Sequence, residues 1–452
     1  LSARDRMAPG MSTTTSGAMG SQPILPPAGF QPEQPRSLLS YASKLDPIMV
    51  FIWAASTMLP TQWGFLAPLR YAAAAYFFLG LILFSRQVLP ALGRAWPLLL
   101  LPILCVISAL WAPSSSEALR KGISLGLTGI VAVYAATRLS GRNILIAYFF
   151  VELIAGVLSL IIRGQGQGAL VGIYDSKNAF AIHMFILYAT SLAVLLDKDN
   201  RPWLRAIAFV AIPTALYLVF MAKSGTTTLL VIGATAIMVG HSLVWKPLSR
   251  VPHGRMFFTV LTLVMVVLGA YIVIGILQID IKEEVLAALG KDATLTSRTM
   301  LWEIAERVMQ ENPWTGLGAN GYWRPENGMA NTITNVIMGW DRYINFSFHN
   351  SYYENGVNFG YPGYFATAVL AAWICLSAAL TWLRNQSVVN SAFLVLALML
   401  VTRTFSEIDL SMEFSGTCVL MFIAASRAKK QGQSSVAPVL DYGRSIAARV
   451  KP

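Results

Sequence analysis

The sequence predicts an all-α integral membrane protein with about twelve transmembrane helices and one large periplasmic helical loop. Three observations support this fold class. The 452 residues are 55% hydrophobic and 12% charged, with a mean hydropathy of +0.57, whereas soluble domains carry about 25% charged residues. Apolar runs of membrane-spanning length recur along the chain. Basic residues alternate between successive loops, as expected for a polytopic membrane protein.

The apolar runs define the predicted transmembrane helices, at about 20 residues per helix. Nine precede a long polar segment and three follow it. The predicted spans are 46–62, 68–84, 95–111, 117–137, 143–162, 178–196, 203–222, 227–245, 256–278, 358–383, 388–404 and 411–427.

The chain therefore divides into five parts. Residues 1–44 are rich in Ser, Thr, Pro, Gly and Gln and are predicted to be a disordered cytoplasmic tail. Residues 45–278 contain helices one to nine, residues 279–357 form the large periplasmic catalytic loop, and residues 358–428 contain helices ten to twelve. Residues 429–452 form a second cytoplasmic tail.

Lys and Arg residues set the predicted orientation. With the N-terminus inside, the loops that fall in the cytoplasm are the basic ones, which is the positive-inside pattern. The loop 279–357 then lies outside, in the periplasm of a bacterium, and both termini lie in the cytoplasm. The basic residues of these inner loops are Arg86, Arg94, Arg138, Arg142, Lys198, Arg201, Arg205, Lys246, Arg250, Arg255 and Arg384. The net charge of +12 thus reflects membrane orientation and not nucleic-acid binding, and the predicted location is the bacterial inner membrane.

Seven basic residues break this pattern, because they fall at the outer ends of spans. One interpretation is that each extends to phosphates of the outer leaflet. The other is that several line a cavity for a polyanion, for which Arg offers a planar fork and Lys a mobile point charge. The seven residues are Arg120, Lys121, Arg163, Lys177, Lys223, Arg298 and Arg403.

The segment 296–312 of the loop is predicted to be an amphipathic helix that ends before Pro313. Leu301 and Ala305 belong to its apolar face, and Glu303 to its polar face. Arg298 lies at the N-terminus of this helix, where its charge opposes the helix dipole but where backbone N–H groups favour a bound anion.

The loop also contains a glycine pattern, Gly316, Gly318 and Gly321, that matches a dinucleotide-binding motif by its letters. It follows a helix and a proline, and no βαβ unit surrounds it, so a nucleotide site is rejected. The pattern is interpreted as a turn that packs against Trp314 and Trp323.

His349 is the candidate general base. An imidazole can accept a proton from a sugar hydroxyl near neutral pH. Asn350 and Tyr353 lie beside it in sequence, and Glu354 is close enough to orient one ring nitrogen. The alternative is a structural role, which is the commoner role of a single histidine.

Five short motifs resemble the O-antigen ligase and Wzy-type polymerase superfamily, whose members are membrane type-C glycosyltransferases. The resemblance covers mainly residues 170–380 and depends on the order of the motifs around the loop. The motifs are residues 174–180, 222–228, 297–302, 316–318 and 348–352, followed by Glu354, Gly356 and Gly360.

The resemblance implies a mechanism. The donor is a glycan on undecaprenyl pyrophosphate, His349 activates the acceptor hydroxyl for inverting attack, and Arg298 contacts the pyrophosphate. Lys223 replaces an arginine that ligases of the superfamily tend to have, which favours an exopolysaccharide-type polymerase that joins repeat units. The other predicted substrate-binding residues are Lys177, Arg163, Arg120, Lys121, Arg403, Asn350 and Tyr353.

The first outer loop, residues 61–67, has no carboxylate, whereas metal-dependent type-C transferases place acidic residues there. We therefore expect a metal-independent enzyme without a cofactor, in which Arg and Lys stabilise the leaving group. The expected partners are the lipid-linked glycan and the bilayer, with a chain-length regulator and export proteins as further candidates.

Two other functions stay open. One is a ligase that transfers the glycan to a lipid core or another acceptor. The other is a lipid-glycan transporter, although the internal repeats typical of transporters are missing from the sequence. Ionisable residues near or inside the spans receive a lower rank: Arg403 and Glu407 are interpreted as an internal ion pair, and Glu152 as a hydrogen-bond acceptor. Asp409 and Glu413 belong to the same set.

Overall fold

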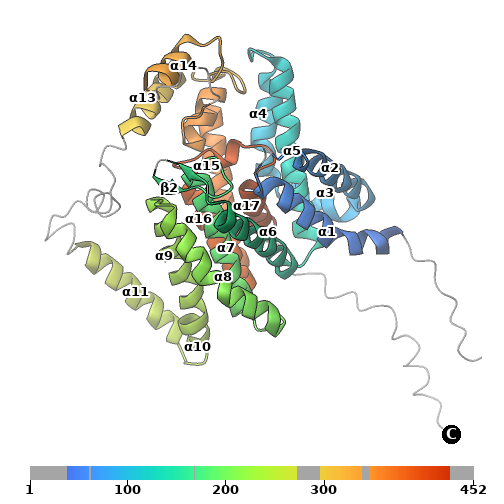
Figure 1. Ribbon diagram of the computed structural model, residues 1–452, viewed down its shortest axis with the longest axis vertical. Helices are drawn as coiled ribbons and strands as arrows, with labels where there is room; N and C mark the ends of the chain where they lie inside the picture. Colours follow the sequence, from blue (N-terminus) through green and yellow to red (C-terminus); the bar gives the residue numbers. More distant parts are fainter. Residues whose placement is uncertain (1–37, 61–62, 167, 272–295, 338–345, 428–452) are drawn as a thin grey trace, which may run out of the picture.

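The computed structural model describes residues 38–60, 63–166, 168–271, 296–337 and 346–427 (Figure 1). Within these ranges the chain is helical apart from turns and one short antiparallel hairpin, formed by β1 (Gln165–Gly166) and β2 (Ala169–Leu170). The chain is thus an all-α, multi-pass membrane protein, as predicted.

The helices follow the chain in this order: α1 (Leu38–Met58), α2 (Leu66–Leu83), α3 (Ser85–Arg94), η1 (Trp96–Leu99), α4 (Leu100–Ser108), α5 (Ser115–Arg138), α6 (Gly141–Ile162), α7 (Lys177–Leu196), α8 (Pro202–Met221), α9 (Gly225–Gly240), η2 (His241–Trp245), α10 (Lys246–Leu248), α11 (Gly254–Ala270), α13 (Thr296–Glu311), α14 (Gly328–Thr332), η4 (Ile333–Ile337), α15 (Ser351–Arg384), α16 (Val388–Arg403), η5 (Asp409–Ser411) and α17 (Gly416–Ser426).

Seven helices of the described chain are long and apolar enough to cross a membrane, and they are α2, α5, α6, α7, α8, α9 continued through α10, and α15. A bent pair, α3 with Trp96–Ser108, makes an eighth if it counts as one span; its two parts meet at 84°. The remaining predicted spans overlap α1, α11 and the shorter helices α16 and α17; residues 61–62 and 272–278 of these spans lie outside the described residues. The predicted total of about twelve therefore stays a prediction.

Two predicted spans differ in form from the observed helices. The span 95–111 begins at the 84° bend, where Pro97 starts a new helical turn after α3. The span 411–427 shortens to α17, because the Ser415 hydroxyl accepts a hydrogen bond from the backbone of Cys418 and caps the helix there.

The core of the membrane region lies around α5, α6 and α7. In the most apolar 18-residue window of α7, 78% of the residues are buried, against 33% for α8. Aromatic side chains such as Tyr134, Tyr148, Phe149 and Phe180 are fully buried there. The central position of α7 fixes its N-terminus, which becomes part of the site described below.

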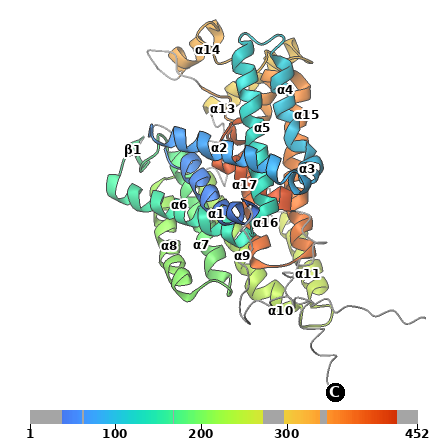
Figure 2. The same cartoon turned by 90° about the vertical axis from the view of Figure 1, so that its right-hand side faces the viewer.

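Helices α13 and α14 with η4 form a lobe at one end of the molecule, while α10 and α11 lie at the other end (Figures 1 and 2). The predicted apolar face of α13 is confirmed: Leu301 and Ala305 are fully buried and Met309 nearly so. They pack with Tyr322 and Phe348 in a second hydrophobic core. The lobe therefore has a packed interior of its own.

Helix α15 begins at Ser351, seven residues before the predicted span 358–383, because the Asn350 side chain caps it. The loop predicted as 279–357 therefore ends at Asn350. A kink at Gly360, whose φ is +70°, separates the first turns of α15 from its long apolar part. Residues 279–295 and 338–345 lie outside the described residues.

The predicted tails differ from the structure at one end. Helix α1 begins at Leu38, inside the predicted N-terminal tail 1–44, because helix-forming residues precede its apolar part. Residues 1–37 and the C-terminal tail predicted at 429–452 lie outside the described residues.

The glycine pattern forms a turn, as predicted, and the turn also bonds to α15. Leu317 and Gly318 donate backbone hydrogen bonds to the carbonyls of Val357 (2.9 Å) and Asn358 (2.8 Å) in α15. A Cβ atom at Gly316 would lie 2.5 Å from the Asn358 backbone. Trp323 is buried in the core against which Leu317 of the turn packs, whereas Trp314 is 77% exposed. The turn needs glycine to approach α15 closely.

Candidate functional site

A narrow polar pocket lies where the N-terminal ends of α7, α9 and α13 meet the segment after α16. Its volume of about 20 Å³ corresponds to a single water-sized sphere. Two arginines and one carboxylate face it, and its other lining side chains are amides and hydroxyls. The lining residues are Asn178, Ser224, Thr226, Thr227, Arg298, Arg403, Ser406 and Glu407.

Helix N-termini dominate the walls of this pocket. Asn178 is the second residue of α7, Arg298 the third of α13, and Thr226 the second of α9. The first turn of each helix has backbone N–H groups without intrahelical partners and a partial positive charge. Three helices of at least 16 residues thus favour an anion at the same place.

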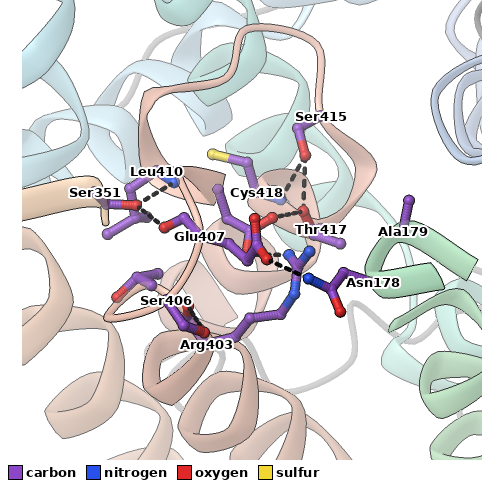
Figure 3. Close-up of polar contacts among 12 residues, drawn as sticks. Asn178, Ala179, Ser351, Arg403, Ser406, Glu407, Leu410, Ser415, Thr417 and Cys418 are labelled. Atoms are coloured by element: carbon purple, nitrogen blue, oxygen red, sulfur yellow. Dashed lines mark hydrogen bonds and ion pairs between the residues drawn. The ribbon is translucent and has the colours of Figure 1, made fainter. Parts of the chain in front are cut away.

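Glu407 supplies that anion within the protein. Its Oε1 atom accepts hydrogen bonds from Arg298 Nη2 at 3.3 Å and Asn178 Nδ2 at 3.2 Å, and its Oε2 atom lies 3.3 Å from His349 Nδ1. Figure 3 shows Asn178 and Arg403 reaching toward this carboxylate from α7 and α16. We call Glu407, Arg298, His349 and Asn178 the Glu407 cluster.

The cluster stabilises the charged form of its carboxylate. Burial alone would raise the pKa of Glu407, but the hydrogen bond to His349 and the charges of Arg403, His349 and Arg298 lower this pKa to about 2. Glu407 is therefore ionised at neutral pH and can only accept hydrogen bonds. The facing Nδ1 atom of His349 must then carry a proton, so Nε2 is the ring nitrogen that remains to act as a base.

The segment after α16 is fixed by bonds to α15. Ser351 Oγ donates to the Glu407 carbonyl at 2.8 Å and accepts from Leu410 N at 3.4 Å, as drawn in Figure 3. Arg403 pairs with Asp409, and Thr417 Oγ1 donates to Asp409 at 3.1 Å. The predicted ion pair of Arg403 with Glu407 is therefore replaced by one with Asp409, which holds the guanidinium at the edge of the pocket.

His349 is held in a backbone conformation that is rare for residues other than glycine, with φ at +49°. The residues on both sides enforce it. Phe348 donates its backbone N–H to Glu354 at 3.0 Å. Asn350 Oδ1 accepts from the backbones of Tyr352 and Tyr353. The prediction that Glu354 orients the imidazole is wrong: Glu354 fixes the preceding backbone, and Glu407 contacts the ring.

Two predicted basic residues lie beside the pocket, displaced by one position from its lining. Lys177 precedes Asn178, and exposed Lys223 precedes Ser224. The backbone of Lys223 has φ at +50° before α9 begins. In both motifs the neighbouring amide or hydroxyl side chain lines the pocket and the lysine does not.

Three other predicted residues lie away from the pocket lining. Lys121 is buried, and its Nζ atom donates to Asn320 Oδ1 at 2.7 Å. Arg120 is exposed. Arg163 is exposed and donates to the Leu160 carbonyl at the end of α6. Of the seven basic exceptions, several of which were predicted to line one cavity, Arg298 and Arg403 line this pocket.

Tyr353 and Asn350 have structural partners. The Tyr353 ring stacks on Trp302 at 6.1 Å between centroids, and Trp302 Nε1 donates to the Phe348 carbonyl at 3.0 Å. Asn350 caps α15 and donates from Nδ2 to the Phe405 carbonyl. Both residues thus support His349 from its neighbours, and their predicted contact with substrate stays a prediction.

The sequence analysis placed Glu407 and Asp409 below the loop residues and did not select Asn178 or Ser224 as site residues. Two signals could have found them. Asn178 and Ser224 belong to the motifs that carried the resemblance, and Glu407 and Asp409 are acidic residues next to an apolar span. Among the described residues, no three His, Cys, Asp or Glu side chains gather as a metal site would require; metal independence stays a prediction.

Comparisons with known proteins agree with the predicted resemblance. Residues 207–368 match the O-antigen ligase family. The chain is also 23% identical over 338 residues to the exopolysaccharide production protein ExoQ of Rhizobium meliloti, across 72% of this chain and 75% of that protein. The family match includes Lys223, Arg298 and His349 and ends before Glu407. The chain is therefore similar to the O-antigen ligase family over residues 207–368 and to an exopolysaccharide production protein over most of its length.

Proposed function

We propose that this protein polymerises oligosaccharide repeat units linked to undecaprenyl pyrophosphate, at the periplasmic face of a bacterial inner membrane. The observation that carries the proposal is the Glu407 cluster. An imidazole with one free nitrogen lies beside a pocket that two arginines and three helix N-termini make selective for anions. Transfer from a lipid pyrophosphate needs both a base and an anion site.

The proposed reaction is an inverting displacement. Nε2 of His349 accepts the proton of the acceptor hydroxyl while the hydroxyl oxygen bonds to the anomeric carbon of the donor. The bond from that carbon to the pyrophosphate oxygen breaks, and the leaving pyrophosphate keeps the electron pair. Arg298 and Arg403 stabilise the negative charge that develops on it. Glu407 holds the tautomer of His349 and stabilises the imidazolium that forms.

The pocket is too narrow for the donor's pyrophosphate unless Glu407 gives up one of its contacts. Glu407 already occupies the centre of the anion site, with three donors at 3.2–3.3 Å. A pyrophosphate that approaches Arg298 competes with Glu407 Oε1 for this guanidinium, while Oε2 keeps its contact with His349. Donor binding therefore exchanges the ligand of Arg298 and opens the pocket.

A ligase is the second candidate, because residues 207–368 match a family described as O-antigen ligase. In a ligase the same pocket holds the same donor, and only the acceptor differs. The similarity to a protein described by exopolysaccharide production and the lysine at position 223 favour the polymerase. A chain-length regulator and export proteins are the partners that a polymerase of this type would serve.

The test is a reconstitution of purified protein with lipid-pyrophosphate-linked repeat units as the only glycan. A ladder of longer lipid-linked products that persists in a chelator supports a metal-independent polymerase. Transfer that appears only after a second acceptor is added indicates a ligase. Movement of the lipid-linked glycan between leaflets without any new product would contradict both and support a transporter.

A further inference from the structure

A second cavity, of about 290 Å³, lies far from the Glu407 cluster, at the other end of α15. The ends of three helices enclose it: the C-terminal turn of α3, the last turns of α15, and the end of α17. Its nine lining residues include two arginines and no carboxylate. They are Ala91, Arg94, Ala95, Trp373, Ser377, Leu380, Arg384, Ala425 and Ser426.

The position of the cavity along α15 fits one surface of a membrane. Ser351, at the start of α15, bonds to the Glu407 segment. The part of α15 from Tyr361 to Arg384 is alone about 35 Å long at 1.5 Å per residue, which slightly exceeds the hydrocarbon thickness of a bilayer. The cavity and the Glu407 cluster are therefore near opposite faces of the membrane. The charge pattern of the sequence independently predicts that the ends of α3, α15 and α17 all lie on the cytoplasmic side.

The lining of the cavity matches the two parts of a phospholipid. Arg94 and Arg384 are exposed at its edge, where guanidinium groups suit a phosphate. Trp373 and Leu380 provide an apolar wall, and Ser426 Oγ is buried without a hydrogen-bond partner among the described residues. Exposed Trp96, next to the cavity in sequence, is typical of the headgroup level of a membrane.

We propose that this cavity binds one anionic phospholipid of the leaflet opposite to the Glu407 cluster, with its headgroup phosphate between Arg94 and Arg384 and an acyl chain against Trp373 and Leu380. The absence of acidic side chains from the lining favours an anionic over a zwitterionic headgroup, because nothing there pairs with an amine. Basic pockets between membrane helices on the cytoplasmic side bind such headgroups by the same chemistry.

The proposal can be tested by native mass spectrometry of the detergent-purified full chain titrated with phosphatidylglycerol or phosphatidylcholine. We expect phosphatidylglycerol to bind at least tenfold more tightly. The variant Arg94→Ala/Arg384→Ala should weaken its binding by roughly ten- to thirtyfold, at about fivefold per arginine. The matched control Arg86→Ala/Arg250→Ala also removes two exposed arginines, one of them from α3, and should bind within twofold of the wild type.

A second variant protects the test against misfolding. Leu380→Trp keeps both arginines and enlarges a side chain that is 48% exposed, so it should fold and still lose phosphatidylglycerol. Equal binding of the two lipids, or equal loss in the control, would overturn the proposal. Displacement of the lipid by millimolar inorganic phosphate would show a simple anion site. Tighter binding of a polyprenyl phosphate would reassign the cavity to the lipid carrier.

Discussion

Two polar clusters tie the loop lobe to the membrane helices, and they are built differently. In the first, Lys121 bonds Asn320 at 2.7 Å and Arg324 bonds Glu117 at 2.9 Å, which joins α5 to the turn region. We call these four residues the α5 anchor. In the Glu407 cluster, one carboxylate is shared by three donors at 3.2–3.3 Å. In the anchor each cation has partners of its own, and Arg324 also pairs with Glu326 at 3.3 Å. In the Glu407 cluster several donors share one anion.

This difference in hydrogen bonding indicates that the α5 anchor has a structural role and that the Glu407 cluster is a binding site. Short charge-assisted bonds with dedicated partners are strong and have no place for another ligand. Longer bonds to a shared carboxylate leave donors that a second anion can use. The pocket adjoins the Glu407 cluster and not the α5 anchor. Substitutions in the Glu407 cluster should therefore change catalysis, and substitutions in the α5 anchor should change stability.

The largest expected effect is that of His349→Ala. Removal of the general base should lower polymer formation by about 10²- to 10⁴-fold, measured as the ladder of lipid-linked products. Because φ at this position is +49°, His349→Asn is the matched variant: asparagine tolerates this conformation and has no basic nitrogen. A near-normal ladder from either variant would exclude the base role of His349.

Glu407→Gln should have the next largest effect, a loss of roughly 10²-fold in turnover. The amide keeps the shape of the side chain but can donate to Nδ1 of His349, and the imidazole then presents the wrong tautomer. The measurement is turnover at saturating donor. Glu413→Gln is the control, since Glu413 belongs to the same segment and does not line the pocket. Equal turnover in the two variants would contradict the orienting role.

The lowered pKa of Glu407 predicts that the stability of the protein depends on pH. The pKa of Glu407 is lowered from 4.5 to about 2 in the folded protein, so its ionised form contributes up to about 3 kcal/mol. This contribution is complete above pH 4.5 and is lost as the pH falls toward 2. The difference in melting temperature between wild type and Glu407→Gln should therefore shrink between pH 5 and pH 3. A difference in melting temperature that stays constant over this pH range would show that ionised Glu407 does not stabilise the fold.

Arg298→Ala should weaken donor use by roughly ten- to a hundredfold, the effect of one charge-assisted hydrogen bond. The loss should appear mainly in kcat/KM for the lipid-linked donor. Arg307→Ala removes an exposed arginine from the same helix, α13, and should behave like the wild type. If Arg307→Ala lost as much, the effect would belong to the net charge of the helix and not to the pocket.

Lys121→Met should change stability instead. It removes the hydrogen bond from buried Lys121 to half-buried Asn320, at a cost of about 1–3 kcal/mol, and should lower the melting temperature. Donor KM should stay near that of the wild type. The neighbouring exposed Arg120 provides the control Arg120→Met. A large rise in donor KM in Lys121→Met would move this lysine from the anchor to the donor site.

The sequence predicted the parts of the molecule that depend on composition and periodicity. The apolar runs located the membrane helices, and the period of α13 located its buried face. His349 and Arg298 were found because they carry recognisable chemistry inside a polar loop. Glu407 was undervalued because its contacts depend on a fold that brings residues 178, 298, 349 and 407 together. These residues are far apart in the sequence, so no sequence motif predicts that they are neighbours.

The lysine motifs show a second limit. Sequence reasoning selected the charged residue of each motif, yet in both cases the pocket is lined by the next residue. The direction of a side chain at a helix start depends on the cap and on local φ values, such as the +50° of Lys223, and these follow from tertiary packing. Charge identifies the motif, but only the backbone identifies the side chain that faces the site.

Substitution of Lys223 should have a smaller effect than any of these, because this residue lies beside the pocket of the Glu407 cluster and does not line it. The side chain is exposed and lies one residue before the pocket lining, so we expect any effect on the donor to be that of a mobile point charge. Lys223→Ala should lower donor use by roughly three- to fivefold, and Lys223→Arg should equal the wild type. Because Lys, Arg and Ala have the same difficulty with a φ of +50°, the difference between the two variants reports charge alone. Equal activity of both would make Lys223 a structural neighbour of Ser224.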